Sequence, residues 1–221
     1  MESPAAGKPR RRYHAPARLA AAARTRAAVV EQAHALFAER GWSGTTIKDV
    51  AADAGVSPKT VEALFGTKAA LLGAAVDFAI RGDVGETPVI ERESGRRVQD
   101  APDAAAMLEL HAAHLRLITP RSARIVSVVE HAAPADRAVE DLWQRITGNR
   151  RVGVHWATEL FLSKPGRPAR ATRADVEPVF WVTVNWATYR TLTELARLDD
   201  DGYENWLRRY YAAMLTSTTR P

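Results

Sequence analysis

Three short segments near the N-terminus each place a hydroxyl residue directly before a run of helix-forming residues. Hydroxyl side chains at such positions cap a helix, and the free N–H groups of a helix start attract phosphate. In the first segment Thr46 and Asp49 also have the spacing of a capping box. The three helix starts are therefore candidate phosphate contacts. Their residues are Thr45, Thr46 and Lys48 in the first segment, Ser57, Pro58, Lys59 and Thr60 in the second, and Thr67 and Lys68 in the third.

The spacing of small and branched residues over residues 47–64 predicts two short helices joined by a tight turn. Ala51 is small where the helices must cross, Gly55 falls where the turn needs a positive φ, and Val56 fills the gap between them. These features together favour a helix-turn-helix, whose second helix enters the DNA major groove by its N-terminal end. The outward positions of that helix are Lys59, Thr60, Glu62 and Ala63.

The rest of the chain has the periodicity and the start and stop signals of helices, which predicts an all-α protein in two parts. A helix from about Arg24 ends at Gly41, with Leu36 and Phe37 as core anchors, and another runs from Lys68 to about Ile80. Residues 1–20 are interpreted as a disordered arm and residues 82–100 as a linker or long loop. Further helices are expected near 103–118, 121–132, 137–163, 173–196 and 200–217, with a break at Pro120.

The excess of positive over negative charge lies entirely in the first third of the chain. The formal net charge is +5, and residues 1–70 hold eleven basic and six acidic residues. Among the remaining residues, basic and acidic side chains are equal in number. This asymmetry indicates a polyanion as the partner of the N-terminal part. A basic tail that only aids solubility is the alternative explanation.

Residues 24–80 resemble the N-terminal signature of the tetracycline-repressor (TetR) family. The resemblance is carried by Leu36 to Trp42, by Thr45 to Val61, by Phe65-Gly66-Thr67-Lys68 and by Leu71-Leu72. It implies a homodimeric transcriptional regulator, usually a repressor, that binds double-stranded DNA at a palindromic operator. The chain departs from the family at Glu62, where a tyrosine usually touches phosphate. Glu62 would instead accept from a cytosine amine, or pair with Lys59 or a neighbouring arginine.

The resemblance and the helical pattern together predict four segments. Residues 1–20 form the basic arm, 21–66 the DNA-binding domain, 67–82 a connecting helix, and 83–221 a helical domain for ligand binding and dimerisation. The dimer contact is expected from the last helices, because residues 203–215 hold more large apolar side chains than packing on one side requires. These side chains are Tyr203, Trp206, Leu207, Tyr210, Tyr211 and Met214.

A pocket for an unknown small-molecule effector is expected in the C-terminal part. Aromatic residues alternate there with threonine and asparagine in a segment without charge between Glu177 and Arg190, which favours an apolar or aromatic ligand. The candidate ligand-binding residues are Trp181, Asn185, Trp186 and Tyr189. His111 and His114, at i and i+3 on one helix, are candidates for a polar pocket wall or a partly exposed position, with a metal site as the weaker alternative.

Several classes of function are disfavoured. The chain has no cysteine, so thiolate chemistry and cysteine-ligated metals are excluded. No catalytic motif, cofactor motif or metal-ligand spacing is present, so we expect no enzyme activity, no cofactor and no metal. No apolar stretch is long enough to span a bilayer and no secretory signal is visible, so a cytoplasmic protein without membrane contact is expected. The rival interpretation is an all-α small-molecule-binding or catalytic protein with a basic interaction arm.

Overall fold

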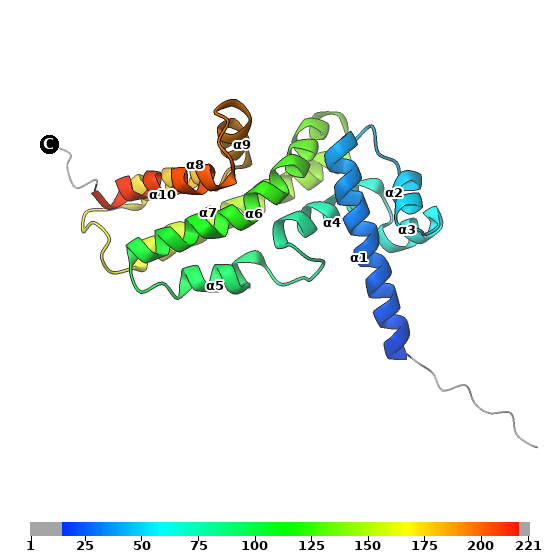
Figure 1. Cartoon of the computed structure of the whole chain (residues 1–221), viewed down its shortest axis with the longest axis horizontal. Coiled ribbons are helices and arrows are strands. Elements are labelled where there is room, and N and C mark those ends of the chain that lie inside the picture. The colour runs from blue at the N-terminus through cyan, green and yellow to red at the C-terminus, as the bar shows by residue number, and fades with distance from the viewer. Residues whose placement is uncertain (1–14, 217–221) are drawn as a thin grey trace, which may run out of the picture.

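The computed structural model describes residues 15–216, and in these residues every regular element is helical. Figure 1 shows an elongated molecule with α1–α4 at one end and α8–α10 at the other. The long helices α6 and α7 lie antiparallel between the two ends. The helices are α1 (Ala15–Arg40), α2 (Ile47–Asp53), α3 (Pro58–Phe65), α4 (Lys68–Arg81), α5 (Glu93–Gln99), α6 (Ala104–Ala132), α7 (Arg137–Ser163), α8 (Arg173–Thr183), α9 (Trp186–Arg190) and α10 (Asp200–Thr216). Short 3-10 turns lie at Val89–Glu91 and Ala133–Ala135, and a π-helical turn lies at Thr191–Leu195.

Two hydrophobic cores share the long helices. The first core joins α1–α4 to the end of α6 and the start of α7, with Phe37, Leu71 and Val129 fully buried. The second joins α5, α8 and α10 to the other halves of α6 and α7, with Met107 and Phe180 fully buried. Because α6 and α7 belong to both cores, they connect the two ends of the molecule directly.

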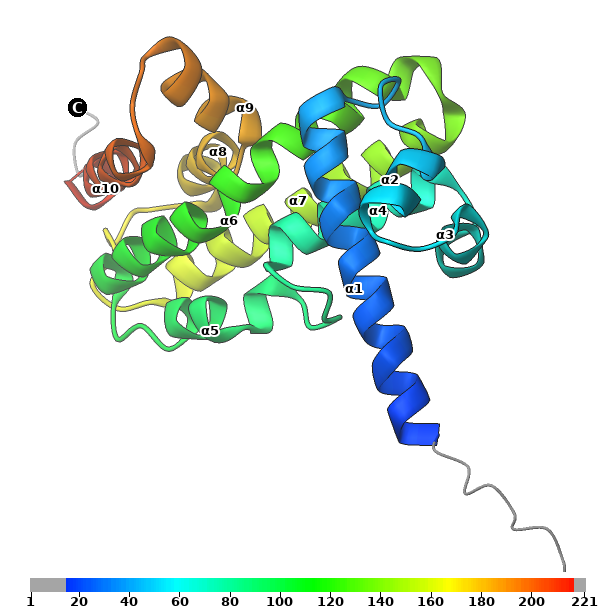
Figure 2. The same cartoon turned by 45° about the vertical axis from the view of Figure 1, so that its right-hand side comes forward.

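The first helix is longer than its sequence pattern predicts. It begins at Ala15, so residues 15–20 are helical and the prediction of disorder for them is wrong, whereas residues 1–14 lie outside the described part of the chain. The segment is rich in alanine, the best helix former, and its N-terminal half projects away from the molecule (Figure 2). The predicted end at Gly41 is confirmed, with φ +71°.

The helix α6 runs without a break through Pro120, contrary to the prediction of two helices. A proline inside a helix costs about 3 kcal/mol. Packing on both sides of it offsets this cost, because Leu115 is buried in the second core and Ile125 in the first. Helix α7 agrees with the predicted helix at 137–163.

Residues 82–100 are not an irregular linker, because α5 forms within them. Gly95 lies so close to the Ile90 carbonyl oxygen that a Cβ would be 2.3 Å from it, and Val98 is fully buried. The segment has few apolar residues, so its helix depends on this packing rather than on periodicity.

The predicted helix at 173–196 is interrupted at Val184 and Asn185. The Arg150 guanidinium donates hydrogen bonds to the carbonyl oxygens of Trp181 (2.6 Å) and Val184 (2.5 Å), while the Asn185 side chain caps α9 by accepting from the Ala187 N–H. Both sides of the break thus have their backbone groups satisfied.

Within residues 15–216, no single helix is both long and apolar enough to cross a membrane. Only α3 and α4 taken together reach that length and composition, and they are bent by 74° relative to each other.

Candidate nucleic-acid interface and ligand cavity

Helices α2 and α3 form the predicted helix-turn-helix at one end of the molecule (Figure 2). The turn contains Gly55 at φ +66°, and the Val56 N–H donates to the Ala51 carbonyl at 2.9 Å. Val50, Ala51 and Val61 are fully buried between the helices. The residues that the spacing argument placed at the crossing and in the turn therefore do occupy those positions.

Each of the three predicted helix starts is capped by its own hydroxyl residue. Thr46 and Asp49 form the complete capping box, and the Thr46 hydrogen bonds lower the pKa of the Asp49 carboxyl. The Ser57 hydroxyl accepts from the Thr60 N–H at 3.1 Å, and the Thr67 hydroxyl accepts from the Ala70 N–H at 3.1 Å. One N–H group at each start is thus bonded to the cap, and the other first-turn amides remain available to an incoming anion.

The outer face of α3 carries one basic and one acidic side chain. Lys59 and Glu62 are both exposed, with Pro58 and Ala63 beside them, whereas Thr60 is half-buried and its hydroxyl bonds to Ser57. Lys48 is also exposed, on α2. Among the described residues the Glu62 side chain forms no hydrogen bond or ion pair, so its alternative role as an intramolecular partner of Lys59 or an arginine is not realised in this structure.

Two predicted phosphate contacts have side chains that are already engaged within the protein. Thr45 is fully buried, and its hydroxyl donates to the carbonyl oxygens of Leu36 (3.1 Å) and Gly41 (3.0 Å) at the end of α1. The Lys68 ammonium donates to the Trp42 carbonyl at 2.5 Å and lies 4.1 Å from the Trp42 ring centre. Burial lowers the pKa of Lys68. Thr45 thus holds the end of α1 and does not face the surface.

Arg26 contributes to the packing of the helix-turn-helix, a role that its sequence position did not predict. Its guanidinium lies 4.5 Å from the centre of the Phe65 ring and donates to the Leu64 carbonyl at 3.2 Å. It therefore ties α1 to the C-terminal end of α3. Nothing in the sequence distinguishes Arg26 from the other basic residues near it.

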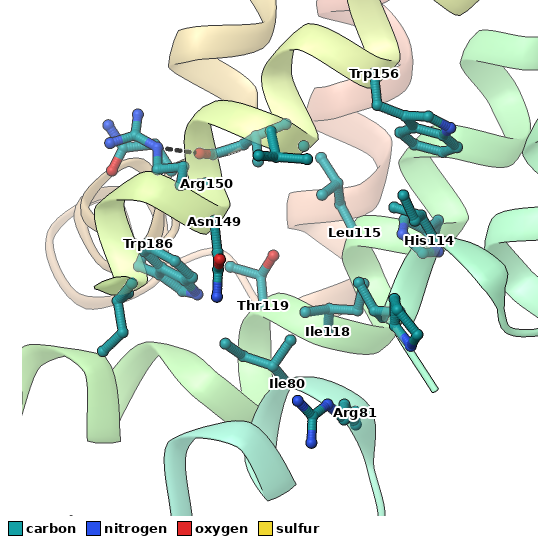
Figure 3. Close-up of a pocket in the computed structure, with 18 of the residues that line it drawn as sticks. Ile80, Arg81, His114, Leu115, Ile118, Thr119, Asn149, Arg150, Trp156 and Trp186 are labelled. Atoms are coloured by element: carbon teal, nitrogen blue, oxygen red, sulfur yellow. Dashed lines mark hydrogen bonds between the residues drawn. The ribbon is translucent and has the colours of Figure 1, made fainter. Parts of the chain in front are cut away.

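A cavity of about 350 Å³ lies between α4, α6, α7 and the break after α8. Figure 3 shows Trp186 and Asn149 toward one end and Trp156 and His114 toward the other, with Ile80 on a third side. Its wall is mostly apolar, as in small-molecule sites. The apolar lining includes Ile80, Val89, Ile90, Leu115, Ile118, Ile146 and Val184.

Of the four predicted ligand-binding residues, the structure brings two to this cavity. Asn185 and Trp186 line it, and Trp186 donates its indole N–H to the Ser122 hydroxyl at 2.9 Å. Trp181 and Tyr189 do not line it. The Trp181 ring lies under the Arg150 guanidinium, and the Tyr189 hydroxyl donates to Asp200 at 2.6 Å. The break at Val184 separates Trp181 from the other three residues, and within α9 the Tyr189 side chain bonds to Asp200 instead of lining the cavity.

Two of the three histidines of α6, His111 and His114, are part of the cavity wall. His111 Nδ1 lies 2.7 Å from the Tyr211 hydroxyl, and His114 Nδ1 lies 2.9 Å from the Ser94 hydroxyl. Burial lowers the pKa of His111 to about 3, with the neighbouring His114 as a second cause, and lowers the pKa of His114 to about 4. Within the described residues, no group of three or more His, Cys, Asp or Glu side chains could hold a metal ion.

Comparison with known proteins agrees with this geometry. Residues 29–75 match the family described as bacterial regulatory proteins, tetR family. No curated protein sequence matches the chain.

Solved structures of regulators share the fold over most of both chains. A protein assigned to the TetR family from Mesorhizobium loti MAFF303099 has a TM-score of 0.66 at 17% identity, covering 88% of this chain and 96% of that chain. NalD, the secondary repressor of the MexAB-OprM multidrug efflux pump in Pseudomonas aeruginosa, has a TM-score of 0.65 at 18% identity, covering 90% and 96%. A TetR-family protein from Rhodococcus sp. has a TM-score of 0.64 at 16% identity, covering 86% and 98%.

The all-helical fold and its helix-turn-helix define a DNA-binding regulator of transcription. Residues 29–75 carry the DNA-binding segment of the TetR family of transcriptional regulators, and the chain as a whole shares the fold of solved TetR-family structures. This match favours the regulator over the rival interpretation of an all-α small-molecule-binding or catalytic protein with a basic interaction arm.

Proposed function

We propose that this protein is a homodimeric repressor that binds a palindromic operator in the cytoplasm and leaves it when a small molecule occupies the cavity. The exposed Lys48, Lys59 and capped helix starts support DNA contact at one face of the helix-turn-helix. The similarity to NalD, itself a repressor, supports repression.

The observation that carries the regulatory part is the position of α4. Its C-terminal residues Asp77, Ile80 and Arg81 line the cavity. Its first half supplies Leu71 and Leu72, fully buried, to the core beneath the helix-turn-helix. A ligand that shifts one end of this helix therefore moves the DNA-binding end with it, and in a dimer it changes the distance between two recognition helices.

The dimer contact is proposed at the C-terminal helices, on a smaller surface than the sequence indicates. Tyr203, Leu207 and Tyr211 are buried in the second core of one chain, so they serve monomer packing. Trp206, half-buried against the second core, stacks on the exposed Tyr210 of α10, with ring centres 5.0 Å apart. Tyr210 is 37% exposed and Val182 on α8 is 39% exposed, which offers apolar surface to a second copy.

Selection from random DNA tests the proposal directly. The expected result is a sequence with dyad symmetry, whose two half-sites lie about one helical turn apart, at ~34–36 Å. Sedimentation of the protein with that sequence should give one dimer per site. Recovery of sequences without symmetry, or binding as a monomer, would contradict the proposal.

A further inference from the structure

The charged side chains around the cavity are already partnered within the protein. Asp77 forms ion pairs with Arg81 at 3.7 Å and with Arg145 at 3.0 Å. The Arg150 guanidinium donates to two backbone carbonyl oxygens at the end of α8, as Figure 3 shows for one of them. Asp77 and Arg81 are thus paired with each other, whereas Arg150, which bonds to neutral carbonyl oxygens, keeps its positive charge at the end of the cavity away from His114 (Figure 3).

The histidine pair is a buried polar feature of the wall that keeps bonding capacity, and Thr119 is a further buried polar residue of the same wall. Each ring uses Nδ1 in a hydrogen bond, His111 with Tyr211 and His114 with Ser94. No further hydrogen bond to either ring is present within residues 15–216, so both Nε2 atoms lack a protein partner. The rings are neighbours, with centres 6.2 Å apart, and both line the cavity.

Both rings are neutral near pH 7, because burial holds the pKa of each well below that value. A neutral imidazole offers one N–H donor and one lone pair. The pair can therefore donate to a carbonyl oxygen, or donate to and accept from a hydroxyl group.

The remaining wall favours a flat apolar molecule. Trp156 packs against both histidines, with ring centres 6.1 Å away in each case. Trp186, toward the opposite end in Figure 3, has its indole N–H bonded to Ser122, so its ring meets the cavity as an apolar surface. Between the two tryptophans the α6 wall is formed by Leu115, Ile118 and Thr119.

We propose that the cavity binds an uncharged, mainly aromatic or alicyclic molecule whose hydroxyl or carbonyl group hydrogen-bonds to His111 and His114. The inference rests on the proposed function only in identifying this molecule as the effector. A carboxylate or ammonium group beside the two histidines would be buried without an oppositely charged partner, which costs far more than a neutral hydrogen bond returns.

Four naphthalene compounds of matched shape test the chemistry with the full-length protein. They are naphthalene, 2-naphthol, 2-naphthoate and trimethyl(2-naphthyl)ammonium, and calorimetry gives the Kd of each at pH 7.5. We expect 2-naphthol to bind about threefold to tenfold more tightly than naphthalene, the factor of one net hydrogen bond. The anion and the cation should bind at least about tenfold more weakly than 2-naphthol.

The variant His114→Leu separates the hydrogen bond from the shape of the cavity. It should remove most of the advantage of 2-naphthol while naphthalene still binds, and retained naphthalene binding shows that the cavity is intact. His131→Leu is the matched control, because His131 is exposed on the same helix and does not line the cavity. It should leave both dissociation constants unchanged.

Three results would overturn the inference: tighter binding of either ion than of 2-naphthol, an equal loss for naphthalene and 2-naphthol in His114→Leu, or no binding of any of the four compounds. Operator affinity is measured separately with saturating 2-naphthol. Binding that follows the expected pattern without any change in operator affinity supports the cavity chemistry and counts against the effector role alone.

Discussion

The two ends of this protein are built on different principles. At the helix-turn-helix each element is fixed by residues close to it in sequence, such as Thr46 with Asp49 and Ser57 with Thr60. At the cavity the important contacts join distant residues, such as His111 with Tyr211 and Arg150 with Val184. The DNA-binding end is therefore specified locally and presents a surface, whereas the cavity exists only when four helices have come together.

The largest difference between the two ends is expected on acidification. The pKa values of His111 and His114 are depressed from 6.5 to about 3 and about 4 in the folded chain, so their contribution to stability is full above pH 6.5 and is lost as the pH falls. At pH 5 the unfolded chain has bound both protons and the folded chain neither, which costs about 2 kcal/mol for each histidine, or about 4 kcal/mol in total. Urea unfolding at pH 7.5 and pH 5.0 measures this change.

The double variant His111→Gln/His114→Gln is the control for this prediction. Every other titrating group is shared with the parent chain, so the variant should lose about 4 kcal/mol less than the parent between the two pH values. An identical loss in both proteins would show that the histidines titrate as they do in the unfolded chain.

The next effect concerns base and phosphate contacts at the DNA-binding end. Lys59 is exposed on the recognition helix, so Lys59→Ala should cost ~1–3 kcal/mol at a guanine that it reads and relax preference at that position. Lys68 holds the Trp42 carbonyl, so Lys68→Ala should lower the melting temperature, whereas Lys59→Ala should leave it unchanged. Binding to a set of single-base operator variants, with thermal unfolding of both proteins, measures the two roles. A uniform loss of affinity with both substitutions and no change in stability would refute this division.

A smaller effect is expected from backbone conformation in the turn. Gly55 has φ +66° and open space where a Cβ would lie, so Gly55→Ala should destabilise the chain by about 1–2 kcal/mol through its backbone alone. Gly148 within α7 also has open space at its Cβ position but lies in a regular helix, so Gly148→Ala should stabilise by about 0.5–1 kcal/mol. Denaturant unfolding of the two variants should give changes of opposite sign. Changes of the same sign would mean that the turn does not require the left-handed conformation.

The smallest effect is expected at a cap. Ser57→Ala removes the side chain that accepts from the Thr60 N–H and should cost about 1 kcal/mol, whereas Ser57→Asn should cost only a few tenths because asparagine caps equally well. The free energy of unfolding of the two variants decides between them. Equal losses would assign Ser57 a role other than capping.

The sequence by itself determined the DNA-binding end in detail. The helix boundaries there follow from caps at Thr46, Ser57 and Thr67 and from glycine at positive φ, which are interactions within a few residues. Such signals can be read along the chain, so the exposed Lys59 and the turn at Gly55 were predicted. These local signals did not predict the orientation of Thr45 and Lys68. Packing around the end of α1 turns both side chains toward the protein.

The position and lining of the cavity depend on the tertiary structure. The sequence indicated aromatic and polar residues near 181–189, but the break at Val184, stabilised by Arg150, 34 residues earlier, separates Trp181 from Asn185 and Trp186 in the wall. Tyr189 bonds to Asp200 instead. Likewise α5 forms because Gly95 meets the Ile90 backbone, and α6 continues through Pro120 because both of its halves are buried. Long-range packing contributes more free energy at these places than local preference does, and no pattern within one segment records it.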